Sequence, residues 1–230
     1  MRYAVISDIH SNLEALEAVI REIPTETPVL CLGDIVGYGS QPNEVIEAIQ
    51  HLNLIAVLMG NHDYAVVTGD VQGFSSDAAS AIRWTRNHIT ARNMQFLSTL
   101  NPEAHLELEG TPIALYHGSP RDPLFEYIYP MISDEEVESL INVSKCRITL
   151  LGHTHVPMCL SVNGGILANP GSVGQPRDGN PNASIGFLSV ASDEFNFQNK
   201  RVKYDVQSAA TKIIQSGLPL FLASRLREGT

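Results

Sequence analysis

Five short apolar runs in this chain of 230 residues each lead directly into polar residues of the types that bind metal ions. This repetition constrains the fold more than any other feature, because residues that follow the carboxyl ends of parallel strands gather along one edge of a sheet. The residues concerned are, in chain order, Asp8 and His10, then Asp34, then Asn61, His62 and Asp63, then His117, and finally His153 and His155. We therefore expect them to form a single site.

The residue types at these positions indicate a metal centre. Gly33, Gly60 and Gly152 stand directly before three of the polar groups, and glycine allows the sharp turns and close approach that a crowded site needs. Imidazole, carboxylate and carboxamide groups together form the mixed nitrogen and oxygen set that Mn, Fe, Zn and Ni accept. A carboxylate such as that of Asp34 can bridge two cations about 3.5 to 4 Å apart. The pattern thus predicts two divalent metal ions.

Strands and helices alternate in the first quarter of the chain. The apolar runs at 3–7, 29–32 and 55–59 predict strands, and helical periodicity covers 12–23 and 42–52. Alternation of this kind is typical of an α/β fold with a largely parallel sheet.

The pattern later changes from helical to β-rich. Residues 75–100 predict two helices with a break near Thr90. The further predicted elements are a hairpin over 104–116, a helix that begins at Ser133, a strand at 147–151, strands at 158–162, 165–168, 185–190, 195–198 and 201–204, and helices at 206–216 and 221–227. The turn-rich region 158–204 predicts an antiparallel second sheet.

Length and composition predict one globular domain over residues 1–230. The net charge is −10 and no basic cluster occurs, so a long nucleic acid is disfavoured as a partner. No apolar run reaches the roughly 18 residues of a membrane span and no signal peptide is evident, so no membrane partner is expected. Three cysteines, Cys31, Cys146 and Cys159, lack any CxxC spacing. They predict reduced core thiols in a cytoplasmic protein.

The polar motifs resemble those of the calcineurin-like metallophosphoesterase superfamily, whose ordered pattern is D-x-H, G-D, G-N-H-[DE], H and G-H-x-H. All five blocks occur between Asp8 and His155, which is about two thirds of the chain. The flanking sequences HSNLEAL, GDIVGYG and NPGSVGQPR are similar to the compact prokaryotic, phosphodiesterase-like branch. The resemblance implies a four-layer α/β/β/α sandwich of two mixed β-sheets flanked by helices.

The same resemblance implies roles for individual residues. It implies a first metal ion held by Asp8, His10, Asp34 and His155, and a second held by Asp34, Asn61, His117 and His153. His62 matches the catalytic histidine that contacts the phosphoryl group or protonates the leaving oxygen. The implied activity is that of a phosphodiesterase or phosphatase that uses metal-activated hydroxide. Two manganese ions are favoured, with Fe, Zn, Ni or Mg as alternatives.

One segment departs from part of the family. Phosphoprotein phosphatases carry an acidic residue and an arginine after the second motif, where this chain has Val36-Gly37-Tyr38-Gly39. A small phosphorylated molecule or nucleotide is therefore the expected substrate. Tyr38, Arg121, Arg177 and Asn12 are the candidates for substrate binding. A structural role stays open as the alternative to substrate binding: each arginine would hold a surface loop in place, and Asn12 would cap a helix.

Two further interpretations remain open. Residues 65–100, which contain Trp84, are predicted to form a helical insertion between two motifs. Three roles are open for this insertion: a lid over the site, an ordinary part of the core, or the face of a homodimer. The alternative function is a non-catalytic, metal-binding scaffold for protein interactions, as in the metallophosphoesterase-like subunit of the eukaryotic retromer.

Overall fold

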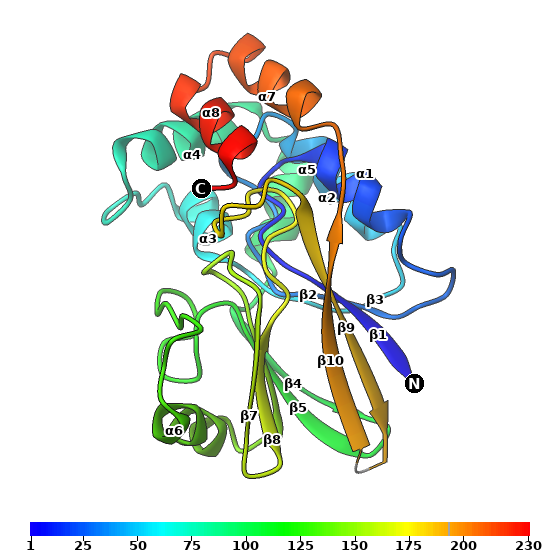
Figure 1. Ribbon diagram of the computed structural model, residues 1–230. Helices are drawn as coiled ribbons and strands as arrows, with labels where there is room; N and C mark the ends of the chain where they lie inside the picture. The colour runs from blue at the N-terminus through cyan, green and yellow to red at the C-terminus, as the bar shows by residue number, and fades with distance from the viewer. Residues whose placement is uncertain (193) are drawn as a thin grey trace.

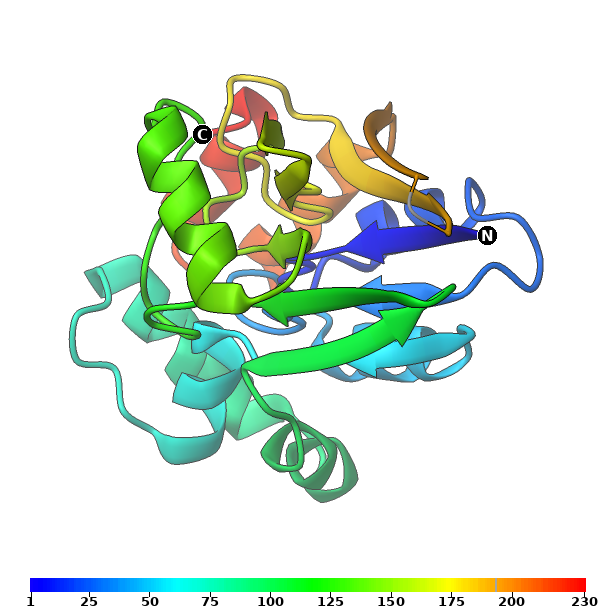
Figure 2. The same ribbon diagram turned by 90° about the horizontal axis from the view of Figure 1, so that it is seen from below.

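The computed structural model describes residues 1–192 and 194–230, and within them two mixed five-stranded sheets lie face to face between outer helices (Figure 1, Figure 2). This is the four-layer arrangement expected from the motifs. In the described parts of the chain, no helix combines the length and apolar character needed to cross a membrane.

The first sheet has the strand order β10-β9-β1-β2-β3. Strand β2 pairs in parallel with both β1 and β3, whereas β9 pairs antiparallel with β1 and β10. The strand bounds are β1 Arg2–Ile6, β2 Val29–Cys31, β3 Leu54–Val57, β9 Ala183–Ala191 and β10 Glu194–Val202.

The second sheet has the order β4-β5-β6-β8-β7. Strand β6 pairs in parallel with β5 and β8, and the outer pairs β4–β5 and β7–β8 are antiparallel. The strand bounds are β4 Glu103–Leu108, β5 Thr111–Tyr116, β6 Ile148–Leu151, β7 Met158–Val162 and β8 Gly165–Asn169.

Apolar side chains fill the space between the layers. Val5 and Leu30 of the first sheet pack against Leu115 and Leu150 of the second. Because alternate residues of a strand point to opposite faces, Ala4 and the other alternate residues of the first sheet meet the outer helices instead. The helices over that sheet include α1 Leu13–Ile20, α2 Pro42–Gln50, α3 Asn61–Thr68 and α5 Ala91–Ser98.

The other helices occupy two places. Helix α6, Asp134–Ser144, covers the outer face of the second sheet through Val137 and Leu140 (Figure 2). Helix α4, Ser76–His88, packs with two helices from the end of the chain, α7 Val206–Gln215 and α8 Leu220–Glu228 (Figure 1). Their contact is made by small residues of α4 and larger ones of α8, among them Ala81 and Leu226.

Three expectations need correction. The region 158–204 does not form an antiparallel sheet of its own, because β9 pairs with β1 and β10 with β9 in the first sheet, while β7 and β8 join the second sheet. Strand β10 is continuous, since Asn199 and Lys200 keep their pairing with β9. Cys159 is exposed, whereas Cys31 and Cys146 are buried as expected.

Candidate metal centre

The predicted metal ligands meet at one end of the two sheets. They come from the loops after β1, β2, β5 and β6 and from the first residue of α3. None is more than 6% exposed; they are Asp8, His10, Asp34, Asn61, His117, His153 and His155. Burying so many titratable and polar groups together is unfavourable unless a bound cation or hydrogen bonds compensate them.

The first group of ligands consists of Asp8, His10, Asp34 and His155, which each offer one ligand atom within 4.8 Å of the others. The Nε2 atom of His155 lies 3.3 Å from Asp8 Oδ1. The Nε2 atom of His10 lies 3.5 Å from Asp34 Oδ2. The two imidazole Nε2 atoms are only 3.1 Å apart, so they point at a common position between them.

The second group consists of Asp34, His117 and His153, again with ligand atoms within 4.8 Å of one another. The Nε2 atom of His117 lies 3.5 Å from Asp34 Oδ2 and 3.1 Å from Asn61 Oδ1. The side-chain oxygen of Asn61 therefore belongs beside this group. Asp34 is common to both groups, which is the arrangement that a bridging carboxylate requires.

Backbone carbonyl groups orient three of the histidines. The Nδ1 atoms of His10, His117 and His155 lie within hydrogen-bond distance of the carbonyl oxygens of Val36, Leu32 and Gln175. An Nδ1–H that donates to a carbonyl leaves the lone pair on Nε2, the atom that faces the cluster. The surrounding loops thus hold these rings in the tautomer that binds a cation.

Asp63 connects the ligand loops from behind. Its carboxylate accepts hydrogen bonds from the backbone N–H groups of Ile35, Val36 and Gly60 at 2.9 to 3.2 Å. These bonds tie the loop after β2 to the start of α3. Asp63 therefore positions Asp34 and Asn61 and is not itself a ligand.

The charge state of the site suits a cation. Burial raises the pKa of Asp8 to about 7, and burial also lowers the pKa of His10 and His155 well below the ordinary histidine value. Both carboxylate oxygens of Asp8 are buried without a hydrogen-bond partner among the described residues. An unpartnered buried carboxylate beside neutral imidazoles is the donor set that divalent transition metals accept, so these residues fit a metal centre.

The backbone at the ligands is unusual. Asp8, His10, Asp34, His153 and His155 all have positive φ angles, between 50° and 67°. Residues other than glycine rarely adopt this left-handed conformation, and such residues cluster at functional sites. The tightly turned loops therefore aim five ligands at one place.

A cavity of about 430 Å³ opens beside the ligands and is lined by His62, Tyr38 and Arg177 among others. The His62 ring packs against Tyr38 with centroids 4.3 Å apart. Burial and the charge of Arg177 lower the pKa of His62 well below the usual value, so the ring is neutral at pH 7. The Arg177 guanidinium donates to the Tyr38 hydroxyl at 3.1 Å.

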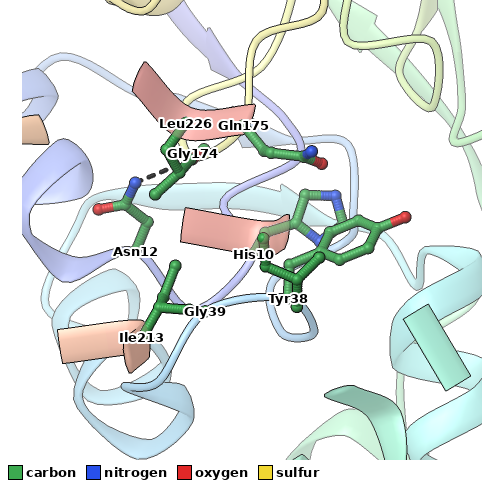
Figure 3. Close-up of a pocket in the computed structure, with 9 residues that line it drawn as sticks. His10, Asn12, Tyr38, Gly39, Gly174, Gln175, Ile213 and Leu226 are labelled. Carbon is green, nitrogen blue, oxygen red and sulfur yellow. Dashed lines mark hydrogen bonds between the residues drawn. The ribbon is translucent and has the colours of Figure 1, made fainter. Parts of the chain in front are cut away.

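Asn12 lies apart from this cavity. Its side-chain oxygen accepts from the N–H of Ala15 at the start of α1, and its amide nitrogen donates to the Gly174 carbonyl at 2.8 Å and to the Tyr204 hydroxyl at 3.3 Å. Figure 3 shows Asn12 turned toward Gly174, in a small cavity of about 10 Å³ whose other wall is formed by His10 and Tyr38. The structure thus gives Asn12 the role of a helix cap.

Arg121 also lies away from the 430 Å³ cavity lining. Its guanidinium forms ion pairs with Glu126 at 2.7 Å and Glu136 at 2.6 Å, with 38% of the side chain exposed. This geometry matches the loop-stapling alternative. Its role in substrate binding remains a prediction without a contact to support it.

Arg225 and the aromatic residues Phe74 and Tyr127 line the same cavity and were not singled out from the sequence. Arg225 lies on α8, far along the chain from every motif. Only the packing of α8 against α4 brings it to the site, so no local pattern indicates it.

Comparisons with known proteins agree with this geometry. Residues 1–193 match the family model described as the calcineurin-like phosphoesterase superfamily domain. An uncharacterised protein of Methanocaldococcus jannaschii is 38% identical over 242 residues, which covers 97% of this chain and 96% of that protein.

Two solved structures share the whole fold. A metallophosphoesterase from Sphaerobacter thermophilus has a TM-score of 0.84 and 32% identity and covers 100% of this chain and 99% of its own. A hypothetical protein from Pyrococcus horikoshii has a TM-score of 0.90 at 22% identity, with 100% and 98% of the two chains covered. The motifs, the ligand geometry and the family match agree, and the chain belongs to the calcineurin-like phosphoesterase superfamily.

Proposed function

We propose that this protein is a dinuclear, metal-dependent phosphoesterase that hydrolyses a small phosphorylated molecule or nucleotide. The observation that carries the proposal is the sharing of the Asp34 carboxylate between two groups of buried ligand atoms. Two cations bridged by one carboxylate are suited to bind a phosphoryl group from two sides.

The ligands divide between the two cations as the family pattern implies. Asp8, His10 and His155 would hold the first cation, and Asn61, His117 and His153 the second, with Asp34 common to both. When bound, two divalent cations supply the Lewis acidity that activates water and offsets negative charge on the phosphoryl oxygens. Manganese is the favoured metal, with Fe, Zn, Ni or Mg as alternatives, because all accept mixed nitrogen and oxygen ligands.

His62 and Arg177 are the residues of this chain proposed to act on the substrate. As a neutral imidazole, His62 carries one N–H to donate to the phosphoryl group or the leaving oxygen. The Arg177 guanidinium is held over Tyr38 and Gln175 by hydrogen bonds to neutral groups, so its charge is available to a phosphate. Tyr38 positions both, since its ring packs on His62 and its hydroxyl accepts from Arg177.

Hydrolysis of two chromogenic esters tests the proposal. The protein is treated with a chelator, reloaded with Mn²⁺, and assayed with bis(p-nitrophenyl) phosphate and p-nitrophenyl phosphate. Asp34→Asn should abolish turnover of both esters. Asp134→Asn, at an exposed position on α6, is the matched control and should leave turnover unchanged.

The alternative is a metal-binding scaffold without catalysis, and the same assay separates it from the enzyme. Protein that binds two ions per chain but hydrolyses neither ester with any divalent metal would favour the scaffold. The intact ligand set and the open cavity beside it support the enzyme.

A further inference from the structure

Two arginines converge on one wall of the cavity beside the metal ligands. Arg177 lies in the loop between β8 and β9, and Arg225 lies on α8. Each guanidinium carbon lies 5.7 Å from the centroid of the Tyr38 ring. Segments separated by almost fifty residues of sequence therefore bring two positive charges to the same tyrosine.

Hydrogen bonds to uncharged side chains hold Arg177, and a backbone oxygen holds Arg225. Arg177 donates to the Tyr38 hydroxyl and to Gln175 Oε1, and its Nε is buried without a hydrogen-bond partner in the described part of the chain. Arg225 donates through Nε to the backbone oxygen of Thr230 at 2.6 Å. Neither guanidinium forms an ion pair with an acidic side chain among residues 1–192 and 194–230.

Two other arginines of this protein form ion pairs. Arg121 contacts Glu126 and Glu136, and Arg201 contacts Asp178. At the cavity, by contrast, burial and the charge of Arg177 lower the pKa of Arg225, and the opposing effects of Tyr38 and Asp77 are smaller. Two like charges placed together without an acidic partner oppose each other, so a bound anion would relieve their repulsion.

We propose that Arg177 and Arg225 form an anion-binding subsite that holds a second phosphate of the substrate, beside the phosphoryl group at the metal centre. This inference rests on the proposed phosphoesterase function and narrows its substrate class to esters that carry two phosphates, such as organic diphosphates. A guanidinium binds phosphate through parallel N–H donors, and two guanidiniums can share one dianionic group. The cavity, of about 430 Å³, leaves room for the organic part against Phe74 and Tyr127.

Arg225 contributes to this subsite from the C-terminal region of the chain. The family model ends at residue 193, whereas Arg225 lies on α8. The metal ligands all lie within the matched region. We therefore assign substrate selection in part to a helix outside that region.

Binding of inorganic pyrophosphate tests the subsite without relying on catalysis. Isothermal titration calorimetry is carried out on the chelated full chain, because pyrophosphate itself binds divalent metals. The metal-free wild type should bind pyrophosphate through the two arginines, and Arg225→Gln should bind it at least about tenfold more weakly. Arg225→Lys retains the charge but loses the parallel N–H donors, so its affinity for pyrophosphate should lie between those of the wild type and Arg225→Gln.

Arg227→Gln is the matched control, because Arg227 is exposed on the same helix and bonds only to Gln207 Oε1 in the described structure. Equal pyrophosphate affinity in wild type and Arg225→Gln would overturn the proposal. An equal loss in Arg227→Gln would overturn it too, by showing a general charge effect. If Arg225→Gln fails to fold, the wild type alone decides, since metal-free wild type that does not bind pyrophosphate contradicts an anion subsite made by the two arginines.

A competition assay on the metal-loaded protein separates failure of this inference from failure of the proposed function. Adenosine diphosphate should inhibit hydrolysis of p-nitrophenyl phosphate at lower concentration than adenosine monophosphate. Arg225→Gln should remove this difference, whereas Arg227→Gln should keep it. Hydrolysis without this preference overturns the subsite alone. Pyrophosphate binding through Arg225 without hydrolysis of any ester overturns the catalytic function and leaves the subsite standing.

Discussion

The backbone N–H of His62 donates to the Oδ1 atom of Asp34 at 2.8 Å. This bond comes from the first turn of α3, where the helix dipole favours a negative charge. It leaves Oδ2 as the oxygen that faces His10 and His117, each at 3.5 Å. The helix that carries His62 therefore also fixes the orientation of the shared carboxylate.

This orientation predicts different metal contents for two variants. Asp34→Asn should lose both ions, because a neutral amide cannot replace the negative charge of the carboxylate that the two groups share. His155→Ala should lose only the ion of the first group, since His155 belongs to that group alone. Elemental analysis of dialysed protein should give about two ions per chain in the wild type, about one in His155→Ala and fewer than one in Asp34→Asn. Equal metal content in the two variants would contradict the sharing of Asp34.

Metal binding should release protons below neutral pH. Burial raises the pKa of Asp8 to about 7, so most of this carboxyl is protonated at pH 6 and ionised at pH 8.5. Metal binding requires the ionised carboxylates of Asp8 and of Asp34, whose pKa burial also raises. Apparent affinity should therefore rise with pH between 6 and 8.5. His10 and His155 are already neutral over this range and add no proton. Calorimetry in buffers of different ionisation enthalpy should show more protons released at pH 6 than at pH 8.5.

His62→Ala should separate catalysis from metal binding. We expect kcat to fall about 100-fold or more, because the N–H at the phosphoryl or leaving oxygen is lost, while the metal content remains that of the wild type. His51→Ala, at an exposed position after α2, serves as the control and should retain full activity. A drop in metal content in His62→Ala that matched the drop in kcat would show that His62 acts through the metal centre instead.

Gly60→Ala should damage the centre through packing alone. A Cβ atom at Gly60 would overlap the carboxylate and backbone nitrogen of Asp34. We expect a loss of roughly 2 kcal/mol or more in unfolding free energy, together with weaker metal binding. At Gly73 an added Cβ meets nothing within 4 Å, although the φ of +84° disfavours alanine. Gly73→Ala should therefore cost only about 1 kcal/mol and leave metal binding intact, as denaturant titration with and without metal can measure.

The metal ligands were predictable because each lies in a short motif at the end of a strand, where neighbouring residues determine the local turn. The assignment of β9 and β10 to the first sheet could not be predicted in this way. The pairing of β9 with β1 joins residues almost two hundred positions apart. Arg225 was missed for the same reason. Its place at the cavity depends on how α8 packs on α4, which no periodicity within α8 reveals.

Asn12 and Arg121 illustrate a different limit. Both stand close to motif residues in the sequence, and the residue type alone allows either substrate binding or a structural bond. In the structure, Asn12 accepts a hydrogen bond from the start of α1, and Arg121 forms ion pairs with two glutamates. Nearness in sequence to a ligand therefore does not indicate the direction of a side chain.

The left-handed backbone at five ligands limits how this centre can evolve. Aspartate, asparagine and histidine tolerate positive φ better than most residues, and they are also good ligands for divalent metals. A change from Asp8 to glutamate, or from His10 to cysteine, would preserve a ligand atom but lose this tolerance. The loops thus admit few replacement ligands, and a lineage that abandoned one of these residues would have to rebuild the turn that carries it.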